Sequence, residues 1–84
     1  MDTDDKIIIE RLKFYADTDK EKNKYFCFKI SSILDLENRL LYWMKKVYIR
    51  SAWYECIEDG EVVSNDRIDI VNFYDTHVIT FAKK

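Results

Sequence analysis

Residues 25–47 read YFCFKISSILDLENRLLYWMKKV, and the spacing of their apolar side chains changes at the serine pair Ser31-Ser32. Before the serines, large apolar side chains occupy alternate positions, which is the period of a strand with one buried face. After them, apolar residues recur three and four positions apart, which is the period of one helical face. The two periods predict a strand over 25–30 and a helix over 33–46.

The start of this helix carries its own capping signals. Ser32 is a favoured N-cap residue, and Asp35 three positions later completes an imperfect capping box with Asp in place of Glu. Asp35 also precedes Arg39 by four residues, which is the favoured order for an ion pair on a helix. The face predicted to pack on the core carries Ile33, Leu36, Leu40, Trp43 and Val47, whereas Tyr42 lies on the opposite arc.

The chain after the helix predicts a β-hairpin. Residues 47–57 are rich in β-branched and aromatic residues, and Asp59-Gly60 is a strong signal for a two-residue turn. A hairpin centred there would pair Ile57 with Val62 and Cys56 with Val63. Continued in the same register, it would place Ile49 opposite Ile70 and Arg50 opposite Asp69, with Ser64-Asn65-Asp66 as a bulge or a loop.

The remaining segments complete an α+β fold. Residues 7–15 contain three consecutive β-branched residues and fit a strand, although their apolar spacing also fits a helix capped by Thr3. Residues 16–24 fit a charged loop, and residues 77–82 alternate like a final strand. The sequence thus predicts one domain over residues 1–84, an antiparallel sheet of about four to five strands with one amphipathic helix packed on one face, in the order ββαβββ.

The composition limits the class of protein. Hydrophobic residues make up 48% of the 84 residues, so the chain can fold, and no apolar run approaches the roughly 20 residues of a membrane span. The acidic start, residues 1–5, is unlike a signal peptide, which favours a soluble cytoplasmic protein. Lysine outnumbers arginine ten to four, a bias typical of the AT-rich genes of many phages and low-GC bacteria.

The candidates for chemistry lack supporting motifs. Glu37 falls within the apolar arc of the helix, and His77 shares strand parity with apolar residues, but no nucleophile, metal-binding or phosphate-binding motif accompanies them. Cys27 and Cys56 have no short spacing between them and fit reduced thiols rather than a disulfide framework. We therefore expect no enzymatic activity, no catalytic residues, no cofactor and no bound metal.

Basic and aromatic residues also mix along residues 24–29, as they do in strands that stack nucleic-acid bases. Period two sends Phe26 and Phe28 to one side, which we interpret as the core side. These two rings are therefore assigned to packing rather than to base stacking.

Charge is distributed unevenly along the chain. Residues 20–50 carry a net charge of +5 and residues 55–75 carry −6, whereas the whole chain carries −2. Such asymmetry steers association with charged partners. The acidic segment lies beside two large aromatic residues, a combination typical of binding hot spots. The predicted protein-binding set comprises Trp53, Tyr54, Glu55, Glu58, Asp59, Glu61, Asp66 and Asp69.

Two functions fit this charge pattern. The first is a non-enzymatic protein-binding module, such as a small phage- or mobile-element-encoded inhibitor whose acidic surface engages a basic, nucleic-acid-processing partner. The alternative is a small nucleic-acid-binding protein, although a pI of about 5.3 weighs against it. A homodimer is compatible with both, because the predicted sheet has free edges. The alternative would use Lys20, Lys22, Lys24, Lys45, Lys46 and Arg50.

Overall fold

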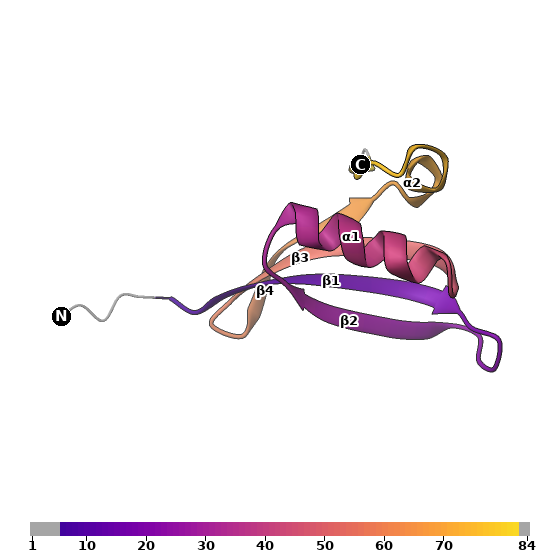
Figure 1. The fold of residues 1–84 in the computed structure, drawn as a ribbon. Coiled ribbons are helices and arrows are strands. Elements are labelled where there is room, and N and C mark those ends of the chain that lie inside the picture. The colour runs from indigo at the N-terminus through magenta and orange to yellow at the C-terminus, as the bar shows by residue number, and fades with distance from the viewer. Residues whose placement is uncertain (1–5, 83–84) are drawn as a thin grey trace.

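A computed structural model describes residues 6–82 of the chain. These residues form two helices and a four-stranded antiparallel sheet in the order β2-β1-β3-β4, so that β1 and β3 are central and β2 and β4 are edges (Figure 1). In chain order the elements are β1 (Ile8–Asp17), β2 (Lys24–Ile30), α1 (Ile33–Met44), β3 (Tyr48–Glu58), β4 (Glu61–Ile68) and α2 (Ile70–Thr76).

The predicted α+β class and antiparallel sheet are confirmed, with four strands and two helices in the order ββαββα. The sequence of residues 7–15 fits both a strand and a helix. In the structure, all of these residues except Ile7 belong to β1. Thr3, the cap of that alternative helix, lies outside the described residues, as does the whole acidic start at residues 1–5.

The capping signals of α1 are confirmed. The Ser32 side chain accepts a hydrogen bond from the backbone N–H of Asp35 (3.0 Å), and the Asp35 carboxylate accepts one from the backbone N–H of Ser31 (3.0 Å). The bond from Ser31, together with the positive charge of Arg39, lowers the pKa of Asp35. The helix then ends at Met44, two residues before the predicted end, with Lys45 as its C-cap.

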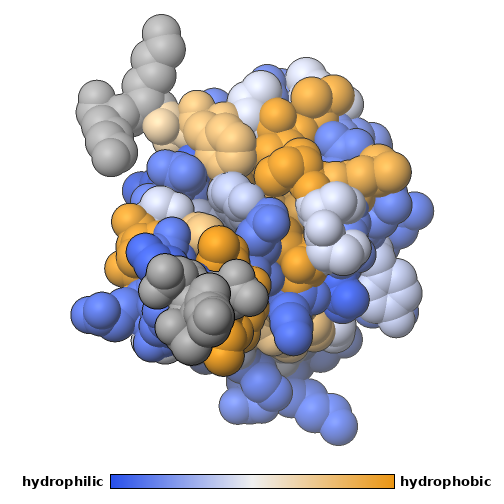
Figure 2. Space-filling model, turned by 90° about the vertical axis from the view of Figure 1, so that its left-hand side faces the viewer, coloured by the Kyte–Doolittle hydropathy of each residue, from blue (hydrophilic) through white to orange (hydrophobic). Residues whose placement is uncertain are grey.

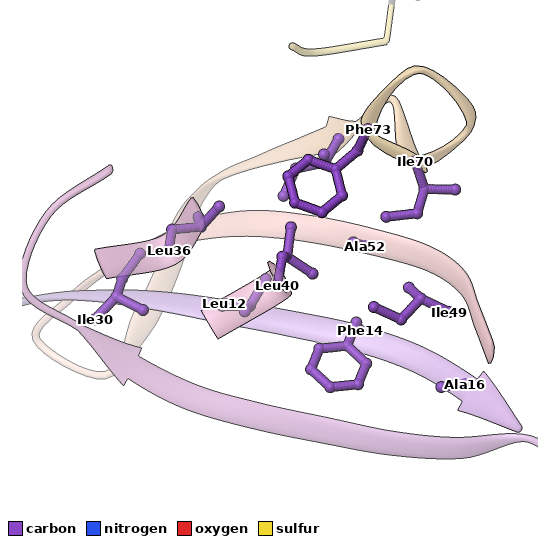
Figure 3. Close-up of a cluster of buried hydrophobic side chains, with 11 residues drawn as sticks. Leu12, Phe14, Ala16, Ile30, Leu36, Leu40, Ile49, Ala52, Ile70 and Phe73 are labelled. Carbon is purple, nitrogen blue, oxygen red and sulfur yellow. The ribbon is translucent and has the colours of Figure 1, made fainter. Parts of the chain in front are cut away.

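One hydrophobic cluster joins both helices to the same side of the sheet (Figures 1 and 3). Trp43 of α1 extends this cluster over β2, with its ring centroid 5.1 Å from that of Phe26 and 5.6 Å from that of Phe28. Such ring pairs add to the stabilisation that comes from apolar burial. The buried members are Leu12, Phe14, Ala16, Ile30, Leu36, Leu40, Ile49, Ala52, Ile68, Ile70 and Phe73.

The β3–β4 hairpin turns at Asp59-Gly60, as predicted. Both residues have positive φ, 49° and 87°, which is the geometry of a type I′ turn. The predicted pair Ile57–Val62 forms, but a β-bulge then places Cys56 opposite Ser64, so the predicted pair Cys56–Val63 is wrong.

The rest of the predicted hairpin register is also wrong. Residues 64–66 continue β4 rather than interrupting it, and β4 ends at Ile68, which lies opposite Ala52. The predicted pairs Ile49–Ile70 and Arg50–Asp69 therefore do not form. The physical reason is that Asp69 and Ile70 begin a helix instead of extending the strand.

The predicted final strand over residues 77–82 is wrong, and the last regular element is α2. The side chain of Asp69 caps this helix by accepting a hydrogen bond from the backbone N–H of Asn72 (3.0 Å). Ile70 and Phe73 lie one turn apart and are both buried, so helical spacing places them in the core. His77 ends α2 with a left-handed φ of 61° and is exposed rather than inward-facing.

The chain after α2 lies beside the end of β4. Phe81 forms an isolated bridge with Ile68, and the backbone N–H of Ala82 donates to the carbonyl oxygen of Arg67 (2.8 Å). The alternation that suggested a strand thus yields one bridge within the described residues. Neither helix of residues 6–82 has the length and apolar character needed to cross a lipid bilayer.

We expect Leu40→Ala to lower the free energy of unfolding by about 2–5 kcal/mol, because Leu40 is fully buried between helix and sheet and its loss leaves a cavity. Tyr42→Ala is the control on the same helix. Tyr42 is 57% exposed, so its truncation should cost about 0.5 kcal/mol or less. Urea titrations of both variants measure the difference, and equal losses would contradict the assignment of the buried face.

We expect Gly60→Val to destabilise the protein by more than about 1 kcal/mol, because a β-branched residue is strained at positive φ. A Cβ atom at this position would meet no other atom within 4 Å, so the cost comes from the backbone alone. Gly60→Asn is the matched control, since Asn tolerates positive φ in this turn. The midpoint of thermal unfolding should be lower for Gly60→Val than for Gly60→Asn. Equal midpoints would contradict the proposed backbone strain at this position.

Candidate functional site

The two faces of the sheet carry different side chains. One face, which we call the helix face, packs against α1 and α2. Within residues 6–82 neither helix covers the opposite face, which we call the open face (Figure 1). Strand pairing places the following residues on the open face: Ile9, Arg11, Lys13, Tyr15, Asp17, Tyr25, Cys27, Lys29, Tyr48, Ser51, Trp53, Glu55, Ile57, Val62, Asn65 and Arg67.

An ion pair between half-buried Arg11 and buried Glu55 crosses the centre of the open face. Glu55 is only 3% exposed, and its carboxylate accepts hydrogen bonds from the guanidinium of Arg11 (2.9 Å from Nε) and from the side-chain amide of Asn65 (3.1 Å). Charge-assisted bonds of this kind satisfy a carboxylate that has lost its water. Glu55 is thereby neutralised by Arg11 and does not oppose an approaching anion.

Aromatic rings surround a second cation on this face. The ammonium group of Lys13 lies 5.0 Å from the ring centroid of Tyr25 and 5.8 Å from that of Trp53, within the range of cation–π attraction. Tyr15 packs beside Tyr25, with ring centroids 4.6 Å apart. Since Tyr25 is 56% exposed, the cluster presents ring surface to solvent.

Two further cations flank the rings. Lys29 on β2 and Arg67 on β4 are both exposed, and they lie toward the two edges of the sheet. Arg67 pairs with Trp53 across the strands and contacts the hydroxyl of Ser51 (3.4 Å). Among the open-face residues defined above, four basic side chains thus meet two acidic side chains, Glu55 at the centre and Asp17 at the end of β1.

Four of the six acidic strand residues lie on the helix face instead. Strand pairing assigns Glu10, Glu58, Glu61 and Asp66 to that side. The hydroxyl of Tyr54 donates to Glu10 (2.6 Å), and this bond with burial raises the pKa of Tyr54 to about 12. Strand alternation therefore places most strand acids on the helix face and most strand bases on the open face, with Asp17, Glu55 and Lys24 as exceptions.

The structure does not bring the predicted protein-binding set onto one surface. Trp53 points to the open face and Tyr54 to the helix face, because adjacent strand residues alternate. Glu55 is buried in its ion pair, and Asp69 is engaged as the α2 cap. Asp66 lies on the helix face of β4. The remaining acids, Glu58, Asp59 and Glu61, gather at the hairpin turn.

The structure does bring the predicted basic set to one end of the molecule. Lys20 and Lys22 lie in the β1–β2 connection and Lys24 begins β2, at the end of the sheet where α1 finishes and β3 starts (Figure 1). Lys45 and Lys46 follow α1 directly, and Arg50 lies near the start of β3.

Acidic residues interrupt this basic end. Arg50 donates to the carboxylate of Asp17 (2.9 Å), and Lys24 lies 3.3 Å from Glu21. A hydrogen bond from the backbone N–H of Asn23, with the nearby Arg50, lowers the pKa of Asp17. A shallow pocket at this end is lined by Lys45 and Lys46 on one side and by Asp17 and Asp19 on the other.

The individual residues considered for catalysis or metal binding have surroundings that fit a structural role. Glu37 accepts a hydrogen bond from the backbone N–H of Ile79 (3.3 Å), which joins α1 to the chain after α2. Cys27 is exposed and Cys56 is half-buried, and the two are not bonded to each other. Residues 6–82 contain no group of three or more His, Cys, Asp or Glu side chains placed to hold a metal ion.

Sequence reasoning missed the open face as a unit. The available signal was the run of alternate residues Arg11, Lys13 and Tyr15 in β1, which are all basic or aromatic and lie between Ile9 and Asp17 of the same parity. That signal can be interpreted only once residues 7–15 are known to be a strand, and once the partners of that strand are known.

No protein-family model, no curated protein and no solved structure matches this chain.

Proposed function

We propose that the protein binds single-stranded nucleic acid on the open face of its sheet. The observation that carries this proposal is the placement of Tyr15, Tyr25 and Trp53 among Lys13, Lys29 and Arg67 on a face that no described helix covers. Single-stranded nucleic acids bind to surfaces of this composition, since bases stack on aromatic rings and phosphates pair with cations.

The arrangement of rings and cations supports both base stacking and phosphate pairing. Lys13 lies between the rings of Tyr25 and Trp53, so a phosphate held by Lys13 would have ring surface on either side for its neighbouring bases. Lys29 and Arg67 would neutralise further phosphates toward the sheet edges. The overall charge of −2 does not prevent this, because the acids of the strands lie mostly on the opposite face.

We expect little discrimination between base sequences. Asn65 is the side-chain amide of the open face, and its NH₂ group already donates to Glu55 (3.1 Å). Stacking and phosphate pairing would then dominate, and both tolerate any base. DNA and RNA share the chemistry of bases and phosphates, so the test includes both.

The test is fluorescence anisotropy with labelled deoxythymidine and uridine oligomers of about 15 nucleotides, long enough for one site. Tyr25→Ala should weaken binding by about 1–3 kcal/mol, roughly 5- to 150-fold, through the loss of one stacked base. Tyr42→Ala is the matched control, because Tyr42 is 57% exposed against 56% for Tyr25 but lies on α1. No binding by the wild-type chain, or equal losses in both variants, would contradict the proposal.

The same titrations at about 50 and 200 mM salt locate the phosphate contacts. Lys29→Gln should reduce the slope of log affinity against log salt by about 0.7, the value for one contact to a single strand. Lys20→Gln makes the same charge change at the basic end and should alter the slope less. If Lys20→Gln has the larger effect, the basic end rather than the open face holds the strand.

A second candidate function is the predicted docking of a basic protein partner at the hairpin turn. Glu58, Asp59 and Glu61 meet there, beside exposed apolar residues at the start of β1 and of β4. Figure 2 views this end of the molecule and shows apolar patches between charged residues. Such mixed surfaces are common in protein interfaces. The apolar residues are Ile7, Ile8, Val62 and Val63.

One triple variant separates the two candidates. Replacing Glu58→Gln, Asp59→Asn and Glu61→Gln together should leave oligonucleotide binding unchanged if the open face is the site. It should weaken retention of basic proteins on the immobilised chain at low salt if the hairpin turn is the site. Circular dichroism checks that the variant remains folded, as expected for exposed charges.

A further inference from the structure

The two edges of the sheet are not equally protected. At β4, a bulge interrupts the pairing pattern near Val63, and the chain after α2 covers the end of the strand through the Phe81–Ile68 bridge and the bond from Ala82 to Arg67. Bulges and covering segments are the usual means by which proteins block edge pairing. The other edge, β2, pairs with β1 over all seven residues and has neither device within the described part of the chain.

The hydrophobic core is also incomplete along β2. Phe26 and Phe28 are only half-buried, although both stack on Phe14 and contact Trp43. Their outer sides, away from β1, meet no further strand in the described residues. An additional strand beside β2 would therefore satisfy free backbone groups and bury aromatic surface at the same time.

We infer that β2 pairs with β2 of a second copy of the chain, antiparallel and centred on Cys27, to form one continuous eight-stranded sheet. A two-fold axis normal to the sheet keeps both pairs of helices on the same side, and this register uses the full length of the strand. Phe26 then lies opposite Phe28 of the second copy on the helix face, and Tyr25 lies opposite Lys29 on the open face.

The self-complementary sequence of β2 favours a second copy over an unrelated strand. Lysines on an edge normally deter pairing, but here Lys24 would face Ile30 and Lys29 would face the ring of Tyr25, so no two charges of the same sign are directly opposed. The aromatic pairs repeat on both sides of the axis. Registers centred on Phe26 or Phe28 would pair only five residues and leave part of the strand unmatched.

The test is the mass of the purified chain without nucleic acid, measured by sedimentation velocity over a range of concentrations. We expect a dimer of about twice the 10.2 kDa chain. Cys27→Glu should raise the dissociation constant by about tenfold or more, because two carboxylates would be directly opposed across the axis. In the monomer the new carboxylate would lie beside Lys13, its cross-strand partner, so the fold should persist.

Two controls make the result specific to this edge. Cys27→Ser introduces no charge and should remain dimeric, and Val63→Glu places the same charge near the other edge and should also remain dimeric. A short bismaleimide should cross-link the wild-type dimer through Cys27, which is exposed, and should fail with Cys27→Ser but not with Cys56→Ser.

A monomeric wild-type chain at all concentrations, or a dimer disrupted by Val63→Glu and not by Cys27→Glu, would overturn the inference. This outcome is independent of nucleic-acid binding. If the dimer forms and the wild-type chain binds no oligonucleotide, only the proposed function fails.

Discussion

The alternation of side chains along β1 is the constraint on which the rest of the structure depends. Leu12, Phe14 and Ala16 are fully buried beneath the helices, whereas the residues between them face the opposite side. Because β1 is central and pairs with both β2 and β3, its register fixes which side chains of those strands join the core. A shift by one residue would place Arg11 and Lys13 in the core and expose Phe14.

This constraint also explains why the open face is suited to binding. Its side chains project from strands that are held by hydrogen bonds on one or both sides, and the two central strands contribute Lys13 and Trp53. Groups on such a scaffold lose little conformational entropy when a ligand arrives. The connection between β1 and β2, by contrast, carries its lysines on an exposed loop.

Local signals in the sequence were sufficient where a few neighbouring residues determine the structure. Ser32 with Asp35 predicted the start of α1, and Asp59-Gly60 predicted the turn, because capping and positive φ are local requirements. The prediction failed at residues 70–82. The helix there has only seven residues, and its two buried positions are too few to produce a recognisable helical spacing of apolar residues. The open face could not be predicted, since Lys13 meets Trp53 only through a pairing between distant strands.

The ion pair between Arg11 and Glu55 has a consequence for how this protein can change. The hydrophobic core cluster and the partly buried residues packed against it include no open-face side chain, so substitutions there can alter the surface without repacking the interior. Glu55 differs, because it is buried and depends on Arg11 and Asn65 for its hydrogen bonds. Replacing Arg11 alone would leave the buried carboxylate of Glu55 without its ion-pair partner, so positions 11 and 55 are expected to vary together. Tyr25, Lys29 and Arg67 differ, because replacing any one of them leaves no buried charge unpaired, and selection there would act on binding rather than on the fold.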